Sequence, residues 1–131
     1  MKLIHQSGTR KKAVARATLT EGAGIVRINS QLLSSLPQTL FKSKIEEPLL
    51  LAGDSAKQVN IEVVVNGGGL NGQAEAARIA IAKTLANFDK KLKSIYLTYD
   101  RALLVADVRR KETHKPNCHG KARAKRQKSY R

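Results

Sequence analysis

The chain has 131 residues, which is enough for one domain with a single hydrophobic core. Lys and Arg number 25 against 10 Asp and Glu, and the formal net charge of +15 favours a polyanionic partner over a small-molecule substrate. Aromatic residues make up only 4% and Trp is absent, so we expect contacts with phosphates to dominate over base stacking.

The cysteine content and the hydropathy pattern bear on the compartment. A single cysteine excludes an intramolecular disulfide and is compatible with a reducing environment. No apolar run approaches the length of a signal peptide or of a membrane span. We therefore expect a cytoplasmic protein with no membrane partner, either free in solution or held in a complex.

The positive charge is concentrated at the two ends of the chain. Residues 1–16 carry five basic side chains and no acid, and residues 109–131 carry ten basic side chains and one acid. Residues 17–108 carry ten basic and nine acidic side chains, which is typical of a solvated globular domain. We therefore predict a globular body over residues 1–108, with a basic N-terminal strand, and a long extended basic tail over residues 109–131.

The predicted tail contains no Ile, Leu, Phe or Met, so it cannot form a core of its own. Fully extended at about 3.3 Å per residue, it would reach roughly 75 Å. One interpretation of this composition is a disordered, solvated tail or a localisation signal. We favour a tail that becomes ordered on binding a polyanion, because ten like charges repel one another without a counter-charge.

The first part of the centre predicts a β-hairpin. Residues 12–20 alternate between small or apolar side chains and a second, more polar set, and residues 25–29 form a second short run after a Gly-containing turn. Arg16 and Arg27 would then point away from the core, toward an external ligand or water. Ser30 is a candidate N-cap for a short helix that follows.

The rest of the centre predicts helices packed on a small sheet. Residues 40–51 are apolar and predict one or two short helices, and residues 59–65 alternate as a strand with one buried face. Apolar positions recur at helical spacing over residues 72–88. Periodicity does not separate helix from strand near the end of the body, although residues 104–108 favour a strand. This order predicts the α+β class, with helices on a small mixed sheet.

The glycine-rich turn over residues 67–72 (GGGLNG) satisfies the G-x-G-x-x-G pattern between a strand and a helix. A dinucleotide fingerprint belongs to the first strand of a doubly wound sheet and needs an acid at the end of the next strand, whereas here Asp89 ends the helix. We therefore expect no cofactor. Two interpretations remain, a tight turn that needs glycine and a helix N-terminus that receives a nucleic-acid phosphate.

Two further clusters resemble sites of enzymes. His114, Cys118 and His119 could contribute to a metal site, but a tetrahedral site needs a fourth ligand and no CxxC or HxxxH pair is present. We expect them to be neutral polar groups facing RNA. Glu46 and Glu47 are adjacent, and adjacent residues on a helix do not converge on one substrate atom. We therefore expect no catalytic activity and no metal.

Several motifs occur in a specific order over nearly the whole chain. They are residues 8–17 (GTRKKAVARA), 24–29 (GIVRIN), 47–50 (EPLL), 67–73 (GGGLNGQ), 99–101 (YDR) and 127–131 (QKSYR). Together they resemble the family of ribosomal protein nine of the small subunit, a universal protein of the subunit head, and in particular its archaeal members.

This resemblance implies a fold and a location. The fold would be a mixed four-stranded sheet with helices packed on one face, in which the strand-turn-helix after Val59 crosses back by a left-handed β-α-β connection. The location would be the head of the small ribosomal subunit, in contact with its rRNA and with neighbouring ribosomal proteins. The tail would extend toward the anticodon stem-loop of the peptidyl-site tRNA.

The candidate site residues follow from the charge distribution and from this resemblance. The candidate rRNA-binding residues are Arg10, Lys11, Lys12, Arg16, Arg27, Gly67, Gly68, Gly69, Gln73, Arg109, Arg110, Lys111, Lys115, Lys121, Arg123, Lys125 and Arg126. The candidate tRNA-binding residues, which the resemblance implies, are Lys128, Ser129, Tyr130 and Arg131. Composition alone also fits a chromatin-like nucleic-acid compactor with basic arms on a small core.

Overall fold

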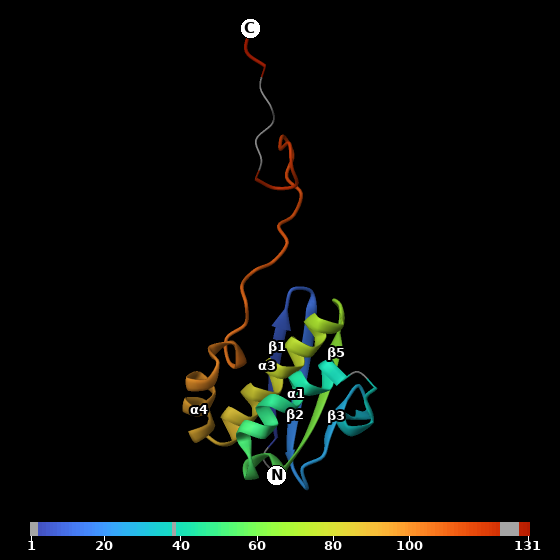
Figure 1. Cartoon of the computed structure of the whole chain (residues 1–131), viewed down its shortest axis with the longest axis vertical. Coiled ribbons are helices and arrows are strands. Elements are labelled where there is room, and N and C mark those ends of the chain that lie inside the picture. Colours follow the sequence, from blue (N-terminus) through green and yellow to red (C-terminus); the bar gives the residue numbers. More distant parts are fainter. Residues whose placement is uncertain (1–2, 38, 124–128) are drawn as a thin grey trace.

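The computed structural model describes residues 3–37, 39–123 and 129–131, and it shows one mixed sheet with helices on one face (Figure 1). The strands are β1 (Ile4–Arg10), β2 (Ala13–Glu21), β3 (Val26–Ile28), β4 (Gln31–Leu32) and β5 (Val59–Asn66). The helices are α1 (Thr39–Ala52), α2 (Asp54–Lys57), α3 (Leu70–Phe88) and α4 (Lys91–Tyr99), with short 3-10 turns at Leu33–Ser35 and Arg101–Leu103. The strand order is β1-β2-β5-β3-β4, in which only β3 and β5 are parallel.

The core lies between this sheet and α3. The inward side chains of β2 are alanines and one leucine, and those of β5 are valines and one isoleucine, all of them buried. Because the β2 side chains are small and α3 is rich in alanine, the helix packs closely on the sheet. Its most extensive contacts are with β1, where a Cβ on Gly8 would lie only 2.7 Å from the backbone nitrogen of Ala80.

The α+β class and the mixed sheet are confirmed, but the sheet has five strands where four were expected. The predicted pairing of residues 12–20 with residues 25–29 is wrong, because β5 lies between β2 and β3. The β2 strand pairs instead with β1 through a tight turn in which Lys11 has a φ of 53°. The Asn60 side chain accepts hydrogen bonds from the backbone of Ala23 and Ile25, which holds the loop after β2 against the start of β5.

The predicted N-cap at Ser30 is also wrong. Asn29 and Ser30 both have positive φ, which is the geometry of a two-residue turn, and this turn joins β3 to β4. The Asn29 side chain exchanges two hydrogen bonds with the backbone of Val65, so it fixes the turn against β5. The short helical turn predicted there begins only at Leu33.

The predicted helix over residues 40–51 is a single helix, α1, that contains Pro48. The predicted strand over residues 104–108 is wrong, because a 3-10 turn capped by Asp100 precedes it and the segment joins no ladder in the described chain. Its alternation does not correspond to burial, since Val105 and Val108 are both exposed. The β-α-β crossover expected after Val59 is not found at that place, because no strand follows α3 in the described residues. The parallel connection runs instead from β3 through α1 and α2 to β5. Every helix in the described ranges is too short or too polar to cross a lipid bilayer.

The close approach of α3 to β1 predicts a strong size limit at Gly8. We expect Gly8→Ala to lower the free energy of unfolding by about 2 kcal/mol or more, because the added methyl group would meet helix backbone rather than a movable side chain. Urea unfolding at neutral pH measures this. Gly72→Ala is the matched control, because its Cβ would lie 3.5 Å from the nearest atom and alanine favours a helix, so it should be neutral or stabilising by up to about 1 kcal/mol. Equal effects of the two substitutions would contradict the packing argument.

Candidate nucleic-acid interface

The turn between β1 and β2 and the glycine-rich turn before α3 lie against each other at one end of the body. A Cβ on Gly67 would lie 2.7 Å from the carbonyl oxygen of Lys12, and one on Gly68 would lie 3.0 Å from Ala13. Both glycines also have positive φ, so the turn requires glycine for its backbone conformation as well as for this contact. The exposed side chains of Lys11 and Lys12 therefore lie beside the start of α3.

The glycine-rich turn also leaves backbone donors at the start of α3 without a side-chain cap. Gly69 is the N-cap residue. The side-chain amide of Gln73 donates a hydrogen bond to the backbone carbonyl of Gly67 at 3.1 Å, which closes the turn. The β5 strand that precedes it lies between antiparallel β2 and parallel β3, so this is not the doubly wound sheet that a dinucleotide fingerprint requires. The turn is explained by packing, and its exposed N–H groups suit an anion.

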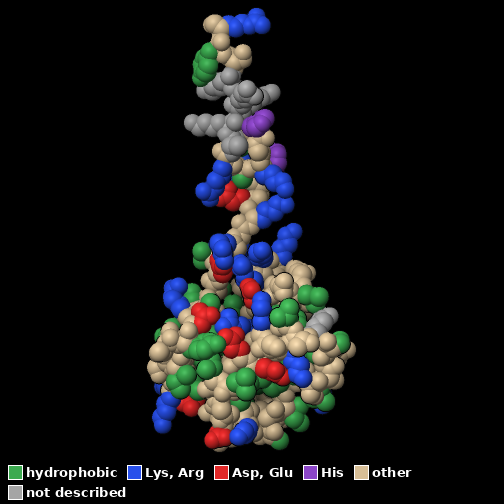
Figure 2. Space-filling view, viewed as in Figure 1, with side chains coloured by type: hydrophobic (Ala, Val, Ile, Leu, Met, Phe, Trp, Pro, Cys, Tyr) green, Lys and Arg blue, Asp and Glu red, His purple; other side chains and the backbone are tan. Residues whose placement is uncertain are grey.

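The segment that leaves the body starts beside the same turns. Arg110 donates to the Thr9 hydroxyl at 3.4 Å. A cleft of about 400 Å³ beside it is lined by three lysines and one acid, together with two neutral polar residues: Lys12, Lys111, Lys121, Glu112, Thr113 and His114. Figure 2 shows Lys and Arg side chains gathered at this end of the body and along the segment that leads from it. The arrangement brings positive charge from the two ends of the sequence into one continuous surface.

Arg16 and Arg27 lie elsewhere, on the sheet face that the helices leave uncovered. Both side chains are exposed, and Arg16 is opposite Val64 in the sheet while Arg27 is opposite Glu62. The structure thus divides the candidate residues of the body into a group at the turns and a pair on the open face.

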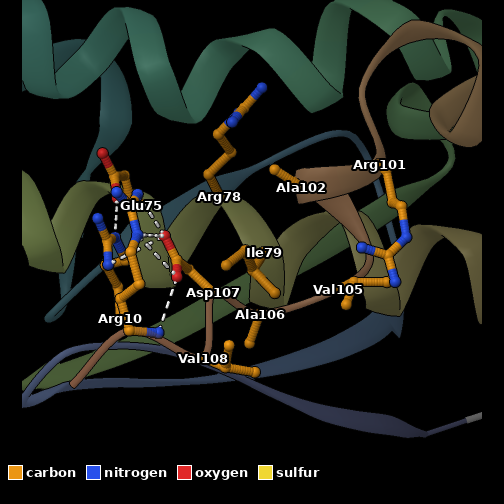
Figure 3. A pocket seen from close by; sticks show the side chains of 11 residues that line it. Arg10, Glu75, Arg78, Ile79, Arg101, Ala102, Val105, Ala106, Asp107 and Val108 are labelled. Carbon is orange, nitrogen blue, oxygen red and sulfur yellow. Dashed lines mark hydrogen bonds and ion pairs between the residues drawn. The ribbon is translucent and has the colours of Figure 1, made fainter.

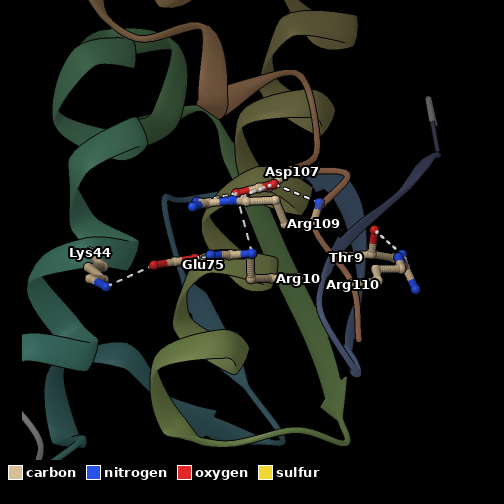
Figure 4. Close-up of polar contacts among 7 residues, drawn as sticks. All are labelled: Thr9, Arg10, Lys44, Glu75, Asp107, Arg109 and Arg110. Carbon is tan, nitrogen blue, oxygen red and sulfur yellow. Dashed lines mark hydrogen bonds and ion pairs between the residues drawn. The ribbon is translucent and has the colours of Figure 1, made fainter. Parts of the chain in front are cut away.

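Arg10 differs from every other candidate on the body because it is engaged inside the fold. Its side chain is only 15% exposed, with Nε 2.6 Å from Oε2 of Glu75 and Nη1 3.3 Å from Oδ2 of Asp107 (Figure 4). Lys44 approaches the other oxygen of Glu75 at 3.2 Å. Arg109, another candidate, donates two hydrogen bonds to Oδ2 of Asp107, from Nε at 2.9 Å and from Nη2 at 2.7 Å.

The segment beyond residue 111 forms a closed loop. Glu112 and Arg123 make an ion pair across it, and the backbone of Lys115 donates to the carbonyl of Lys121 at 2.9 Å. The Cys118 thiol lies 3.6 Å from the carbonyl oxygen of Ala122. Within the described ranges, no three His, Cys, Asp or Glu side chains are close enough to share a metal ion.

The end of the chain bears the remaining candidates. Ser129, Tyr130 and Arg131 are exposed and lie far from the body (Figure 1). The candidates Lys125, Arg126 and Lys128 lie outside the described residues.

The sequence comparisons agree with this geometry. The sequence model of the family described as ribosomal protein S9/S16 matches residues 8–131. The chain is 47% identical to the small ribosomal subunit protein uS9 of Methanococcus vannielii and 46% identical to that of Methanococcus maripaludis strain C5, each over 134 aligned positions covering both chains completely. The chain belongs to the ribosomal protein S9/S16 family. The resemblance found in the motifs is therefore confirmed, including its archaeal character, and the family is one of structural proteins and not of enzymes.

This member of the S9/S16 family contains one cluster of ion pairs that its sequence does not reveal. The sequence predicts no role for Glu75 or Asp107, but both are partners of Arg10. Glu75 is 65 positions and Asp107 is 97 positions from Arg10 in the sequence, and no motif or periodicity marks either of them.

The ion pairs shift the acidity of both carboxyl groups. Hydrogen bonds from Arg109 hold the pKa of Asp107 well below its usual range. Burial raises the pKa of Glu75, but hydrogen bonds and charge from Arg10 and Lys44 outweigh it, so its pKa is also lowered. Both groups therefore favour the folded chain only while they are ionised.

These shifts predict a loss of stability in acid. The unfolded chain, with pKa values of about 3.9 for Asp and 4.3 for Glu, binds protons at a higher pH than the folded chain does. Stabilisation by these groups is therefore complete above about pH 5 and decreases as the pH falls through the lowered folded-state values. The urea concentration at the unfolding midpoint, measured from pH 7 to pH 2.5, should therefore decrease once the pH is lower than about 5.

The control separates these ion pairs from general acid effects. Asp107→Asn should show a smaller decrease between neutral and acidic pH than the parent chain. Glu21→Gln, at the exposed end of β2, should show the same decrease as the parent. A midpoint that stays constant down to pH 2.5 would contradict the assignment.

Proposed function

We propose that the chain is a structural component of the small ribosomal subunit, a cytoplasmic particle, and that its body binds rRNA in the subunit head. Its partners there are rRNA and neighbouring ribosomal proteins. The proposal is supported by the family match and by the name of the relatives, which are small-subunit proteins. It rests above all on one observation, the continuous basic surface formed by the β1–β2 turn and the start of residues 109–131.

The mechanism of binding follows from the charge. Each Lys or Arg that neutralises a phosphate releases a condensed counterion, so binding is strong, dependent on salt and nearly independent of base sequence. The exposed lysines at the turns, the N–H groups at the start of α3 and the exposed basic side chains beyond residue 110 are the groups that we assign to rRNA. The folded body supplies the specific location, because charge alone does not choose a site.

We further propose that residues 109–131 act as a tail that extends toward the anticodon stem-loop of the peptidyl-site tRNA. The exposed position of Ser129, Tyr130 and Arg131 far from the body supports this assignment. Arg131 suits the end of the tail, because its planar guanidinium can pair with a phosphate through two hydrogen bonds. The family resemblance implied a left-handed β-α-β crossover after Val59. Since the parallel connection of the described chain runs from β3 through α1 and α2 to β5, we propose that the left-handed crossover is this one.

The role of the turns is tested by matched charge removal. Replacing Lys11, Lys12 and Lys111 with Gln should weaken binding of the full chain to small-subunit rRNA, because three phosphate contacts are lost. The slope of log affinity against log salt is negative, and its magnitude should decrease by about 0.7 to 0.9 for each lost contact, or roughly 2 to 3 in total. A filter-binding or anisotropy titration at several salt concentrations measures it.

The control removes the same charge from another part of the body. Lys90, Lys91 and Lys93 are exposed at the start of α4, and their replacement with Gln should change the slope by less than about 1. Equal slopes for the two triple variants would mean that only net charge matters. That outcome favours the nucleic-acid compactor, which should also migrate with DNA and not with small subunits in a sedimentation gradient.

The role of the tail end is tested by truncation. Removing residues 128–131 should leave sedimentation of the protein with small subunits intact and lower retention of peptidyl-site tRNA roughly three- to tenfold, since two cationic contacts are lost. Arg131→Lys keeps the charge without the planar fork and should give an intermediate loss. Equal tRNA retention by truncated and parent subunits across a salt titration would disprove the role of the tail.

A further inference from the structure

Three segments that are far apart in the sequence meet where residues 104–111 leave the body. Arg10 ends β1, Glu75 is in the second turn of α3, and Asp107 lies just before the predicted tail. The Arg10 guanidinium lies between the two carboxylates, at 2.6 Å from Glu75 and 3.3 Å from Asp107. Figure 4 shows this arrangement together with Arg109, which holds the same carboxylate of Asp107.

We propose that Arg10 is a positioning residue that fixes the point and direction at which the tail leaves the body, and not a ligand of rRNA phosphate. The inference deepens the proposed function and rests on it, because the direction matters only if the tail has a target.

The first support is that side chains provide the restraint at this point. Leu103 is completely buried, and Leu104 is partly buried against the core. Residues 106–111 make no backbone-to-backbone hydrogen bond with any other described residue. The ion pair of Arg10 with Asp107 and the hydrogen bond of Arg110 with Thr9 are therefore the polar contacts that tie this segment to β1.

The second support is electrostatic. A phosphate that approached Arg10 would also approach the ionised carboxylates of Glu75 and Asp107, and like charges repel. Separating Arg10 from both acids would leave a side chain that is only 15% exposed without a carboxylate partner, which is unfavourable. Lys11 and Lys12 are next to Arg10 in the sequence and are exposed, so they are the better phosphate ligands.

The fold contains a close structural counterpart that serves as a control. Arg78 in α3 is also 15% exposed and also lies between two carboxylates, with Nε 2.6 Å from Glu47 and Nη2 3.0 Å from Asp100. Arg10 and Arg78 border the same cavity of about 650 Å³ between α3 and residues 101–109 (Figure 3). Of these two arginines, only Arg10 has a partner beyond residue 103. Substitution of Arg78 therefore tests general stabilisation by a partly buried ion pair, and substitution of Arg10 tests control of the tail as well.

The test measures the geometry of the tail directly in the full chain. Nitroxide labels on the single cysteine, Cys118, and on Ser94→Cys at the exposed side of α4 report the distance between tail and body by pulsed electron paramagnetic resonance. Arg10→Gln should broaden the distance distribution at least twofold, and Arg78→Gln should leave its width unchanged. Asp107→Asn should broaden it as well, and it leaves the Arg10–Glu75 contact in place if Arg10→Gln fails to fold.

A second readout separates positioning from phosphate binding. Arg10→Gln should keep the slope of log rRNA affinity against log salt within about 0.3 of the parent value, whereas loss of a phosphate ligand decreases the magnitude of this slope by about 0.7 to 0.9. An unchanged distance distribution in both Arg10→Gln and Asp107→Asn, equal broadening in Arg78→Gln, or a slope lowered by a full contact would each overturn the inference. Failure of the proposed function is distinguishable, because it would appear in the lysine variants of the turns while the distance measurements on Arg10 stayed as expected.

Discussion

The close packing of α3 on β1 and β2 is the constraint on which the rest of the structure depends. Gly8 and the alanines of β2 and α3 let the helix lie almost in backbone contact with the sheet. As a result the start of α3 and the β1–β2 turn are forced together, and Gly67 and Gly68 are the residues that make this junction possible. The basic surface is thus a consequence of how the core packs, and the lysines of the turn are carried on a rigid support.

Charge is segregated in the structure as it is in the sequence. Most acids of residues 17–108 are used in ion pairs, such as those of Glu75 and Asp107 with Arg10 and of Glu47 and Asp100 with Arg78. The basic side chains of the turns and of the segment beyond residue 110 have few acids near them. A phosphate therefore meets uncompensated charge at one end of the molecule and compensated charge over much of the helical layer.

Local patterns predicted the elements whose burial follows their period. The strand at residues 59–65 and the helix at residues 72–88 were found because one face of each is fully buried. The pairing of β2 was predicted wrongly for two reasons. The tight turn at Lys11, which joins β1 to β2, is local but was not recognised, and the place of β5 between β2 and β3 is held by distant contacts of Asn29 and Asn60. The exposed lysines could likewise be predicted from charge alone, whereas the environment of Arg10 depends on residues brought together only by the fold.

A fixed exit point changes what a basic tail can do. A freely jointed chain loses conformational entropy for each residue that becomes ordered on RNA, about 1–2 kcal/mol for the backbone alone. The ion pair at Asp107 restricts the first residues of the tail before binding, and the Glu112–Arg123 loop restricts a second stretch. Preorganisation of this kind lowers the entropic penalty of ordering, and it favours one direction over the many that electrostatic attraction alone would permit. Under the proposed function, attraction to phosphate would then act on a chain whose first residues already have a fixed direction.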